Sequence, residues 1–133
     1  MAERVYCLYR GKDQESILMQ KNACHDFAEK KGWNIVGEEQ EIGVSGYKVS
    51  TDDLVKLKRI RKAAEQGEFD ILLVFMYDRL GRNLNETPFI AEWFTKKGIH
   101  VWSVYEGEII DGVDAERMLD YICFWQTDEA QKL

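Results

Sequence analysis

The chain of 133 residues has few of the residues that mark several large classes of protein. Its three cysteines, Cys7, Cys24 and Cys123, are scattered and form no CxxC pair, so we expect buried reduced thiols rather than disulfides. The two histidines, His25 and His100, have no partner at the spacing of metal ligands. We therefore expect no metal site.

Long apolar runs and an excess of positive charge are also missing. No stretch approaches the roughly 20 apolar residues that cross a bilayer, and the N-terminus lacks the apolar core of a signal peptide. We expect a cytoplasmic protein with no membrane partner. The net charge of −6 argues against a stand-alone DNA binder, because affinity for duplex DNA comes largely from neutralising phosphates. It does not exclude a catalytic domain that a separate basic module delivers to DNA.

Nucleotide-binding motifs are absent, since the sequence holds neither GxxxxGK[ST] nor GxGxxG. Gly43-Val44-Ser45-Gly46 resembles a phosphate-binding loop only superficially. Asp111, Asp114 and Glu116 fit no metal-ligand spacing, so we interpret them as solvated acids. No cofactor and no small-molecule substrate are expected.

What the chain does contain is a regular alternation of apolar runs and helical periodicity. Strands are predicted over residues 5–9, 33–36, 71–76 and 99–105, and helices over 16–31, 54–66, 87–97 and from 116 almost to the end. Residues 38–53 and 106–114 are predicted loops. This alternation predicts an α/β fold in three layers, with a mainly parallel sheet of four to five strands flanked by helices.

Some predictions concern single helices. Ser16 is expected to be the N-cap of the first long helix. Phe89, Ile90, Trp93 and Phe94 are expected to form a buried stripe. The last helix carries Tyr121, Phe124 and Trp125, and we favour pairing of this helix with a second chain over completion of the core.

Arginines follow two of the predicted strands. Arg10 ends the first strand, and Asp78-Arg79-Leu80-Gly81-Arg82 follows the third. Ligands of open α/β sheets bind beyond the carboxyl ends of the strands, and arginine holds phosphate oxygens with a planar charged fork. If these strands are neighbours, their guanidinium groups can hold one phosphodiester. The alternative is a charged turn with no ligand.

A basic run occupies the second predicted helix, with Lys56, Lys58, Arg59, Arg61 and Lys62. It is either a solvated helix face or a face that contacts the DNA backbone. On the second interpretation, Lys56 and Arg59 are the DNA-binding candidates.

Four segments together resemble the catalytic domain of serine recombinases, the resolvase/invertase superfamily. They are Tyr9-Arg10, Ser16-Ile17-Leu18-Met19-Gln20, Gly43-Val44-Ser45-Gly46 and Asp78-Arg79-Leu80-Gly81-Arg82, in matching order over nearly the whole chain. Residues 75–79 and 87–94 look like the large serine recombinases of mobile elements. The resemblance implies that residues 1–133 are one catalytic domain and that the DNA-recognition region lies elsewhere.

The resemblance also implies an activity. A serine attacks a DNA phosphodiester, a 5′-phosphoserine link forms, and strands are exchanged in a tetramer assembled from dimers, without ATP or metal. By the same resemblance, Arg10, Arg79 and Arg82 would bind the scissile phosphate, Asp78 would orient the arginines, and Gln20 would help to arrange the site. The partners would be DNA and further copies of the chain, joined through the final helix.

Three short departures from the family pattern matter. The family usually has Val-Ser-Thr or a similar segment after this arginine, with the serine as nucleophile, but here no serine follows Arg10. No arginine lies between Asp53 and Leu54, and the last helix ends abruptly. We expect that the parent chain carries short additional segments at these places and that the nucleophile lies in the first of them. The alternative is a true deletion, which would leave an inactive oligomerisation or regulatory module. An unrelated α/β phosphate-binding or signalling domain is a third possibility.

Overall fold

The computed structural model describes residues 3–42, 51–80 and 86–109, with side chains except at 51–56, 78, 86–88 and 109. Five strands form one sheet in the order β2-β1-β3-β4-β5. Their bounds are β1 (Arg4–Gly11), β2 (Asn34–Ile42), β3 (Ile71–Val74), β4 (His100–Ser103) and β5 (Gly107–Ile109). The first four are parallel to one another, and β5 is antiparallel to β4. The predicted mainly parallel sheet is confirmed.

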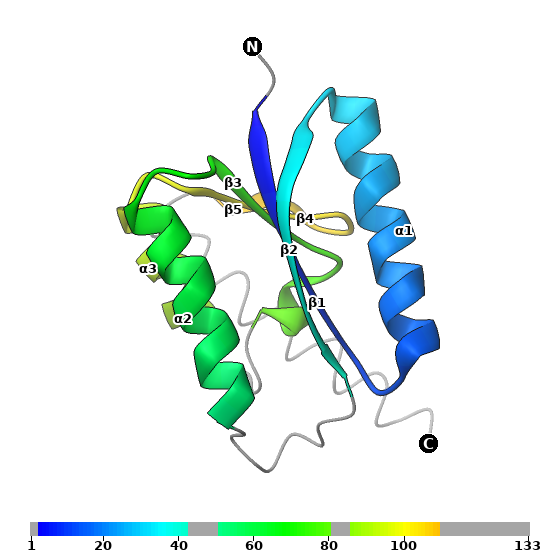
Figure 1. Cartoon of the computed structure of the whole chain (residues 1–133). Coiled ribbons are helices and arrows are strands. Elements are labelled where there is room, and N and C mark those ends of the chain that lie inside the picture. Colours follow the sequence, from blue (N-terminus) through cyan, green and yellow to red (C-terminus); the bar gives the residue numbers. More distant parts are fainter. Residues whose placement is uncertain (1–2, 43–50, 81–85, 110–133) are drawn as a thin grey trace.

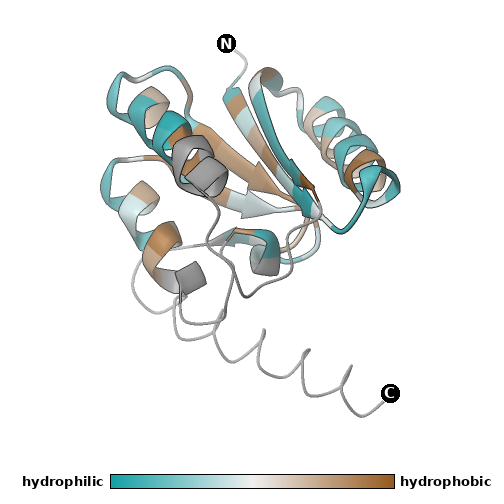
Figure 2. Cartoon of the chain, turned by 60° about the horizontal axis from the view of Figure 1, so that its bottom comes forward, coloured by the Kyte–Doolittle hydropathy of each residue, from teal (hydrophilic) through white to brown (hydrophobic). Residues whose placement is uncertain are grey.

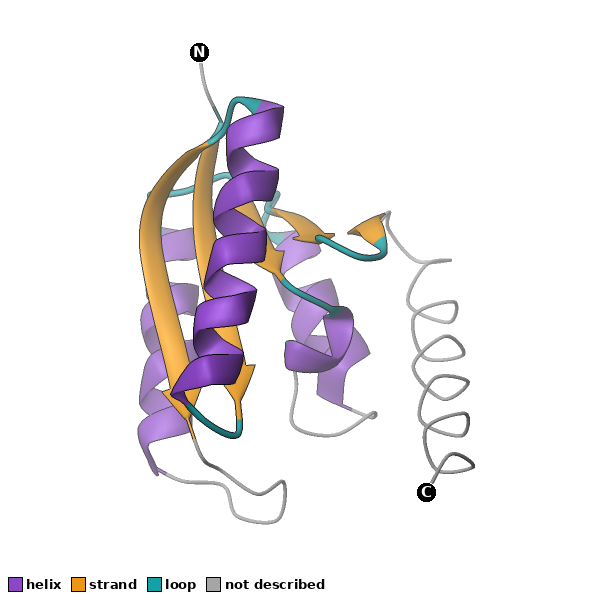
Figure 3. Cartoon of the chain, turned by 90° about the vertical axis from the view of Figure 1, so that its right-hand side faces the viewer, coloured by secondary structure: helices purple, strands orange, loops and turns teal. Residues whose placement is uncertain are grey.

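Helices cover both faces of this sheet. Helix α1 (Gln14–Lys31) lies on one face, and α2 (Thr51–Glu65) and α3 (Glu86–Lys96) lie on the other (Figures 1 and 3). A single 3₁₀ turn, η1 (Tyr77–Arg79), follows β3. The three-layer α/β fold is therefore as predicted, while the predicted C-terminal interface helix lies outside the described residues.

The core has two halves because side chains of a strand alternate between the two faces of the sheet. On β1, Cys7 and Tyr9 pack on the α1 side, and Leu8 packs with residues of α2 and α3. All four residues of β3 are buried, as expected for a central strand covered on both faces. Figure 2 shows the hydrophobic colouring concentrated in the central strands.

Two of the three cysteines lie in the described part of the chain. Cys7 and Cys24 are buried and reduced, as predicted. A hydrogen bond with Cys7, together with burial, raises the pKa of the Cys24 thiol, which makes it a poor nucleophile. Within the described ranges, none of the helices is long and apolar enough to span a bilayer.

The boundaries of several elements were predicted wrongly. β2 continues to Ile42, so residues 38–42 form a strand rather than the start of a loop. Strand β3 ends at Val74, two residues early, and residues 107–109 form β5 instead of a loop. Helix α2 begins at Thr51, three residues before the predicted start.

Two side-chain predictions were also wrong. Asp13 is the N-cap of α1, and its side chain accepts a hydrogen bond from the Ser16 backbone N–H at 2.8 Å. Ser16 therefore lies inside the first turn. In α3, Ile90 and Phe94 are buried but Phe89 is 71% exposed, because it lies on the outward side of the helix.

Candidate active site

Arg10 lies near the carboxyl end of β1, and its side chain is on the face covered by α2 and α3. The alternation along β1 places Arg10 on the same side as Leu8, which packs in that half of the core. The Arg10 side chain is only 15% exposed. The sheet edge thus holds a guanidinium group that is mostly shielded from solvent.

Gln20 fixes the backbone of Arg10. The paired ladder between β1 and β3 ends at Leu8 and Val74, so Arg10 lies beyond it. The fully buried Gln20 amide supplies the hydrogen bonds that a neighbouring strand would otherwise make. Its Oε1 accepts from the Arg10 N–H at 3.1 Å, and its Nε2 donates to the Arg10 carbonyl. Gln20 therefore contacts the backbone rather than the guanidinium group of Arg10.

Glu41 is a partner of Arg10 that no sequence pattern predicted. Its carboxylate Oε2 lies 3.0 Å from Arg10 Nε, and its side chain is 9% exposed. The two residues are register partners on β2 and β1. A buried carboxylate beside Arg10 holds the guanidinium group in one orientation. Correct extension of β2 to Ile42 would have revealed this pairing.

The second arginine comes from the η1 turn. β1 and β3 are adjacent parallel strands, so their carboxyl ends meet at one edge of the sheet. Tyr77 and Leu80, which flank Asp78 and Arg79, are buried in the same half of the core as Leu8. Arg10 and the η1 turn therefore share one edge and one face of the sheet.

The other predicted site residues are described only in part. Arg82 and the Gly43–Gly46 loop lie outside the described residues, as do the side chains of Asp78 and Lys56. Arg59 is 64% exposed, and its guanidinium lies 3.8 Å from Glu39 of β2.

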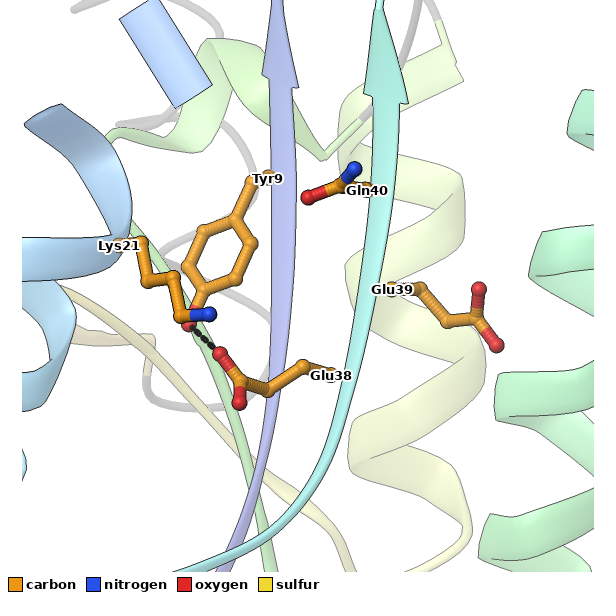
Figure 4. Close-up of a pocket in the computed structure, with 5 residues that line it drawn as sticks. All are labelled: Tyr9, Lys21, Glu38, Glu39 and Gln40. Atoms are coloured by element: carbon orange, nitrogen blue, oxygen red, sulfur yellow. Dashed lines mark hydrogen bonds between the residues drawn. The ribbon is translucent and has the colours of Figure 1, made fainter. Parts of the chain in front are cut away.

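A separate open cavity of about 260 Å³ lies on the opposite side of β1, towards α1. Figure 4 shows Tyr9, Lys21 and Glu38 on that side, while Glu39 points to the other face of β2. Glu38 Oε2 accepts from the Tyr9 hydroxyl at 2.7 Å and lies 3.0 Å from His25 Nε2. This cavity is therefore distinct from the arginine site.

The Glu38 contacts predict an acid-sensitive component of stability. Partial burial would raise the pKa of Glu38, but hydrogen bonds with His25 and Tyr9 outweigh it and lower that pKa below 4.5. A lowered folded pKa contributes stability above the unfolded value, and this is lost as pH falls through the folded value. The free energy of unfolding of Glu38→Gln, measured in urea from pH 6 to pH 3, should fall less steeply than that of the wild type.

Glu29→Gln, on the exposed surface of α1, is the matched control for this experiment. It should leave the pH dependence as in the wild type. Equal slopes for Glu38→Gln and the wild type would show that the Glu38 network contributes nothing to acid stability.

Ser16 lies close to Arg10 in the chain but on the wrong side of β1. A Cβ atom built on Gly11 would come within 2.5 Å of Ser16 Oγ, so Ser16 occupies the side that Gly11 faces. Arg10 faces the opposite side, because neighbouring residues of a strand alternate. Ser16 Oγ also accepts from Gln20 Nε2 at 3.3 Å. Its hydroxyl is thus poorly placed to attack a phosphate held by Arg10.

Several solved structures have a fold similar to that of this chain. The N-terminal catalytic domain of TP901-1 integrase is 25% identical, with a TM-score of 0.72 over 95% of this chain and 98% of that one. The C-terminal catalytic domain of ISC1926 TnpA, an IS607-like serine recombinase, is also 25% identical, with a TM-score of 0.66 over 77% and 70% of the two chains.

A resolvase family site-specific recombinase from Streptococcus pneumoniae shares the fold, with a TM-score of 0.72 over 97% of this chain and 91% of that one at 20% identity. No curated protein sequence matches the chain.

A family model also matches the chain. The model of the resolvase N-terminal domain matches residues 10–125, which include both arginine segments and most of the chain. The chain is therefore a member of the resolvase family and the catalytic domain of a serine-type site-specific DNA recombinase.

Proposed function

We propose that Arg10, Arg79 and Arg82 bind the scissile phosphate of DNA. The observation that carries this proposal is that β1 and β3 are neighbours and end at the same edge of the sheet. Guanidinium groups held there can offset the negative charge that develops on the phosphate oxygens in a pentacoordinate transition state. Binding of this kind also requires that the arginines are held in place before DNA arrives.

Other residues hold the arginines. Gln20 fixes the Arg10 backbone and Glu41 pairs with its guanidinium group. In the proposed mechanism, Asp78 orients the arginines. Gln20 and Glu41 reduce the motion of Arg10, so that little ordering is needed when the phosphate binds.

The chemistry is a covalent phosphoryl transfer. A serine hydroxyl attacks the phosphorus in line, its proton leaves, and the bond to the 3′ oxygen breaks to give a 3′ hydroxyl and a 5′-phosphoserine. After strand exchange, a 3′ hydroxyl attacks the phosphoserine, the strand is rejoined and the serine is released. The covalent link conserves the energy of the phosphodiester bond.

The nucleophile belongs to a segment between Arg10 and Gly11 in the parent chain. In this sequence β1 passes into α1 through Lys12 and Asp13 alone, which contain no hydroxyl group. A protein mass equal to the 15.6 kDa of this sequence would contradict an additional segment. The second candidate function, an inactive recombinase-like oligomerisation or regulatory module, is favoured by the absence of a serine at this place.

DNA binding and oligomerisation are general properties of the family. For this chain we propose a dimer that assembles into a tetramer for strand exchange, with the last helix in the interface and a DNA-recognition region elsewhere in the parent protein. A cytoplasmic location accords with this function.

Covalent trapping tests the proposed function. The parent protein is incubated with duplex DNA that carries its attachment site, then denatured, and protein joined to 5′ ends is detected by gel mobility and mass spectrometry. A covalent adduct is expected. Cleavage that leaves protein on 3′ ends, or binding of the site without any adduct, would contradict the proposed chemistry.

A further inference from the structure

The η1 turn, which contains Arg79, is held from outside by the connection between β4 and β5. The backbone N–H of Tyr77 points at the Glu106 carboxylate, 3.3 Å from Oε1 and 3.4 Å from Oε2. The Tyr77 hydroxyl donates to the Gly107 carbonyl. Two contacts from one connection therefore converge on the first residue of η1.

The η1 turn needs such support because its start has no cap of its own. Met76 stands at the N-cap position and makes no side-chain capping bond. The first N–H groups of a helical turn lack partners inside the turn, and burial without a partner is costly. The Glu106 carboxylate supplies an acceptor for the Tyr77 N–H.

The connection that presents Glu106 is itself well anchored. The Glu106 backbone N–H donates to the fully buried Ser103 hydroxyl at 2.7 Å. The ladder between β3 and β4 continues past the strand ends through Val104 N–H and the Val74 carbonyl at 3.0 Å. Gly107 has a φ of 89°, which side-chain-bearing residues rarely adopt. The position of Glu106 is therefore fixed relative to β3.

We propose that Glu106 is a positioning residue for Arg79, acting through the Tyr77–Arg79 turn that its carboxylate caps. This inference rests on the proposed role of Arg79 in binding the scissile phosphate. Glu106 holds the turn in the orientation that presents Arg79 to the phosphate. It also joins the arginine site to β5, the strand that leads into residues 110–133.

The test is a double-mutant cycle on DNA affinity, which does not require cleavage. The affinity of the parent protein for duplex DNA carrying its attachment site is measured for the wild type, Glu106→Ala, Arg79→Ala and the double variant. Glu106→Ala should weaken binding about tenfold when Arg79 is present, and should have no further effect when Arg79 is alanine. A loss of overall stability would weaken both backgrounds alike.

Matched variants test whether the effect of Glu106→Ala comes from loss of the Glu106 carboxylate. Glu106→Gln keeps an oxygen acceptor for the Tyr77 N–H and should retain most of the affinity. Glu108→Gln, on the adjacent β5, removes an acid that pairs with His100 at 2.7 Å and should have no effect. Tyr77→Phe removes only the bond to Gly107 and should weaken binding in the same Arg79-dependent way.

Hydrogen exchange provides a second readout in the free protein. The Tyr77 amide should exchange about tenfold faster in Glu106→Ala than in the wild type, with little change in the amides of α1. If Glu106→Ala does not fold, Tyr77→Phe carries the same cycle with Arg79→Ala.

The outcomes distinguish a failure of the inference about Glu106 from a failure of the proposed role of Arg79. If Arg79→Ala weakens binding but Glu106→Ala has no effect, or has an equal effect in both backgrounds, Glu106 is not a positioning residue and the role of Arg79 stands. If Arg79→Ala itself leaves the affinity unchanged, the proposed role of Arg79 fails, and the inference about Glu106 fails with it.

Discussion

Insertion of Val-Ser-Thr between Arg10 and Gly11 is expected to give a protein that becomes covalently joined to the 5′ ends of cleaved DNA. The 133-residue chain without the insertion is expected to form no such adduct. The measurement is the yield of adduct on duplex DNA carrying the attachment site, with a nick near the cleavage position so that the adduct accumulates. The insertion is therefore expected to create DNA cleavage activity in a chain that has none.

The geometry of β1 explains why the insertion should work. In an extended segment, the residue two positions after Arg10 faces the same side as Arg10, so the inserted serine would lie beside the guanidinium group. In the present sequence that place belongs to Lys12. The bonds between Gln20 and the Arg10 backbone precede the insertion point and should survive it. A longer connection at the surface costs little free energy.

Val-Ala-Thr at the same place is the matched control, and it should fold as well as the serine insertion and form no adduct. An adduct with the alanine insertion, or with the original chain, would show that another hydroxyl is the nucleophile. Ser16 would then be the first candidate for the nucleophile, although it lies on the opposite side of β1.

Arg79→Ala in the cleavage-competent insertion protein is expected to lower the single-turnover cleavage rate by about a thousandfold. Removal of one preorganised group that stabilises transition-state charge typically costs a hundredfold or more, and arginines that act on phosphoryl transfer contribute still more. Arg79 follows the buried β3 but is itself only partly buried. The free energy of unfolding should therefore change little.

Arg4→Ala is the matched control for this variant. Arg4 is also an arginine of the sheet, but it lies at the first residue of β1, at the opposite end from Arg10, and its guanidinium group pairs with Asp70 at 3.0 Å. Its removal should change the cleavage rate by less than about threefold. An unfolded Arg79→Ala protein, or equal rates for the two variants, would favour a purely structural role for the turn.

The sequence predicts the centre of the fold well because burial there leaves a strong pattern. β3 is apolar at every position, and its predicted start at Ile71 is confirmed. The order of strands and helices then leaves few topologies, since parallel strands need a helical crossover between them. Placement of Arg10 near the end of β1 follows from the same pattern, but the adjacency of β1 and β3 comes from the fold.

The second half of β2 could not be predicted, because its residue types are unfavourable in strands. This half, Glu38 to Ile42, is rich in carboxylates, which are uncommon in strands. These acids are accommodated by partners distant in sequence, such as Tyr9 for Glu38 and Arg10 for Glu41. Residue type alone therefore argues against a strand here, because one sequence does not show the tertiary contacts that stabilise these acids.

The same limit applies to the groups that hold the site. Glu106 and Tyr77 are 29 positions apart in sequence, and no local pattern connects them. Asp13 was overlooked as the cap of α1 because Ser16 is an equally good capping residue by type. Chemical type identified the arginines and the family resemblance identified Gln20, but Glu41 and Glu106 could be found only from the fold.

The most direct measurement compares DNA duplexes that differ in one charge. One duplex has an ordinary phosphodiester at the cleavage position, and the other has an uncharged methylphosphonate there. The wild-type parent protein should bind the methylphosphonate duplex about tenfold or more weakly. The triple variant with Arg10→Ala, Arg79→Ala and Arg82→Ala should bind the two duplexes equally. If the triple variant discriminates between them as strongly as the wild type, these arginines do not contact the scissile phosphate.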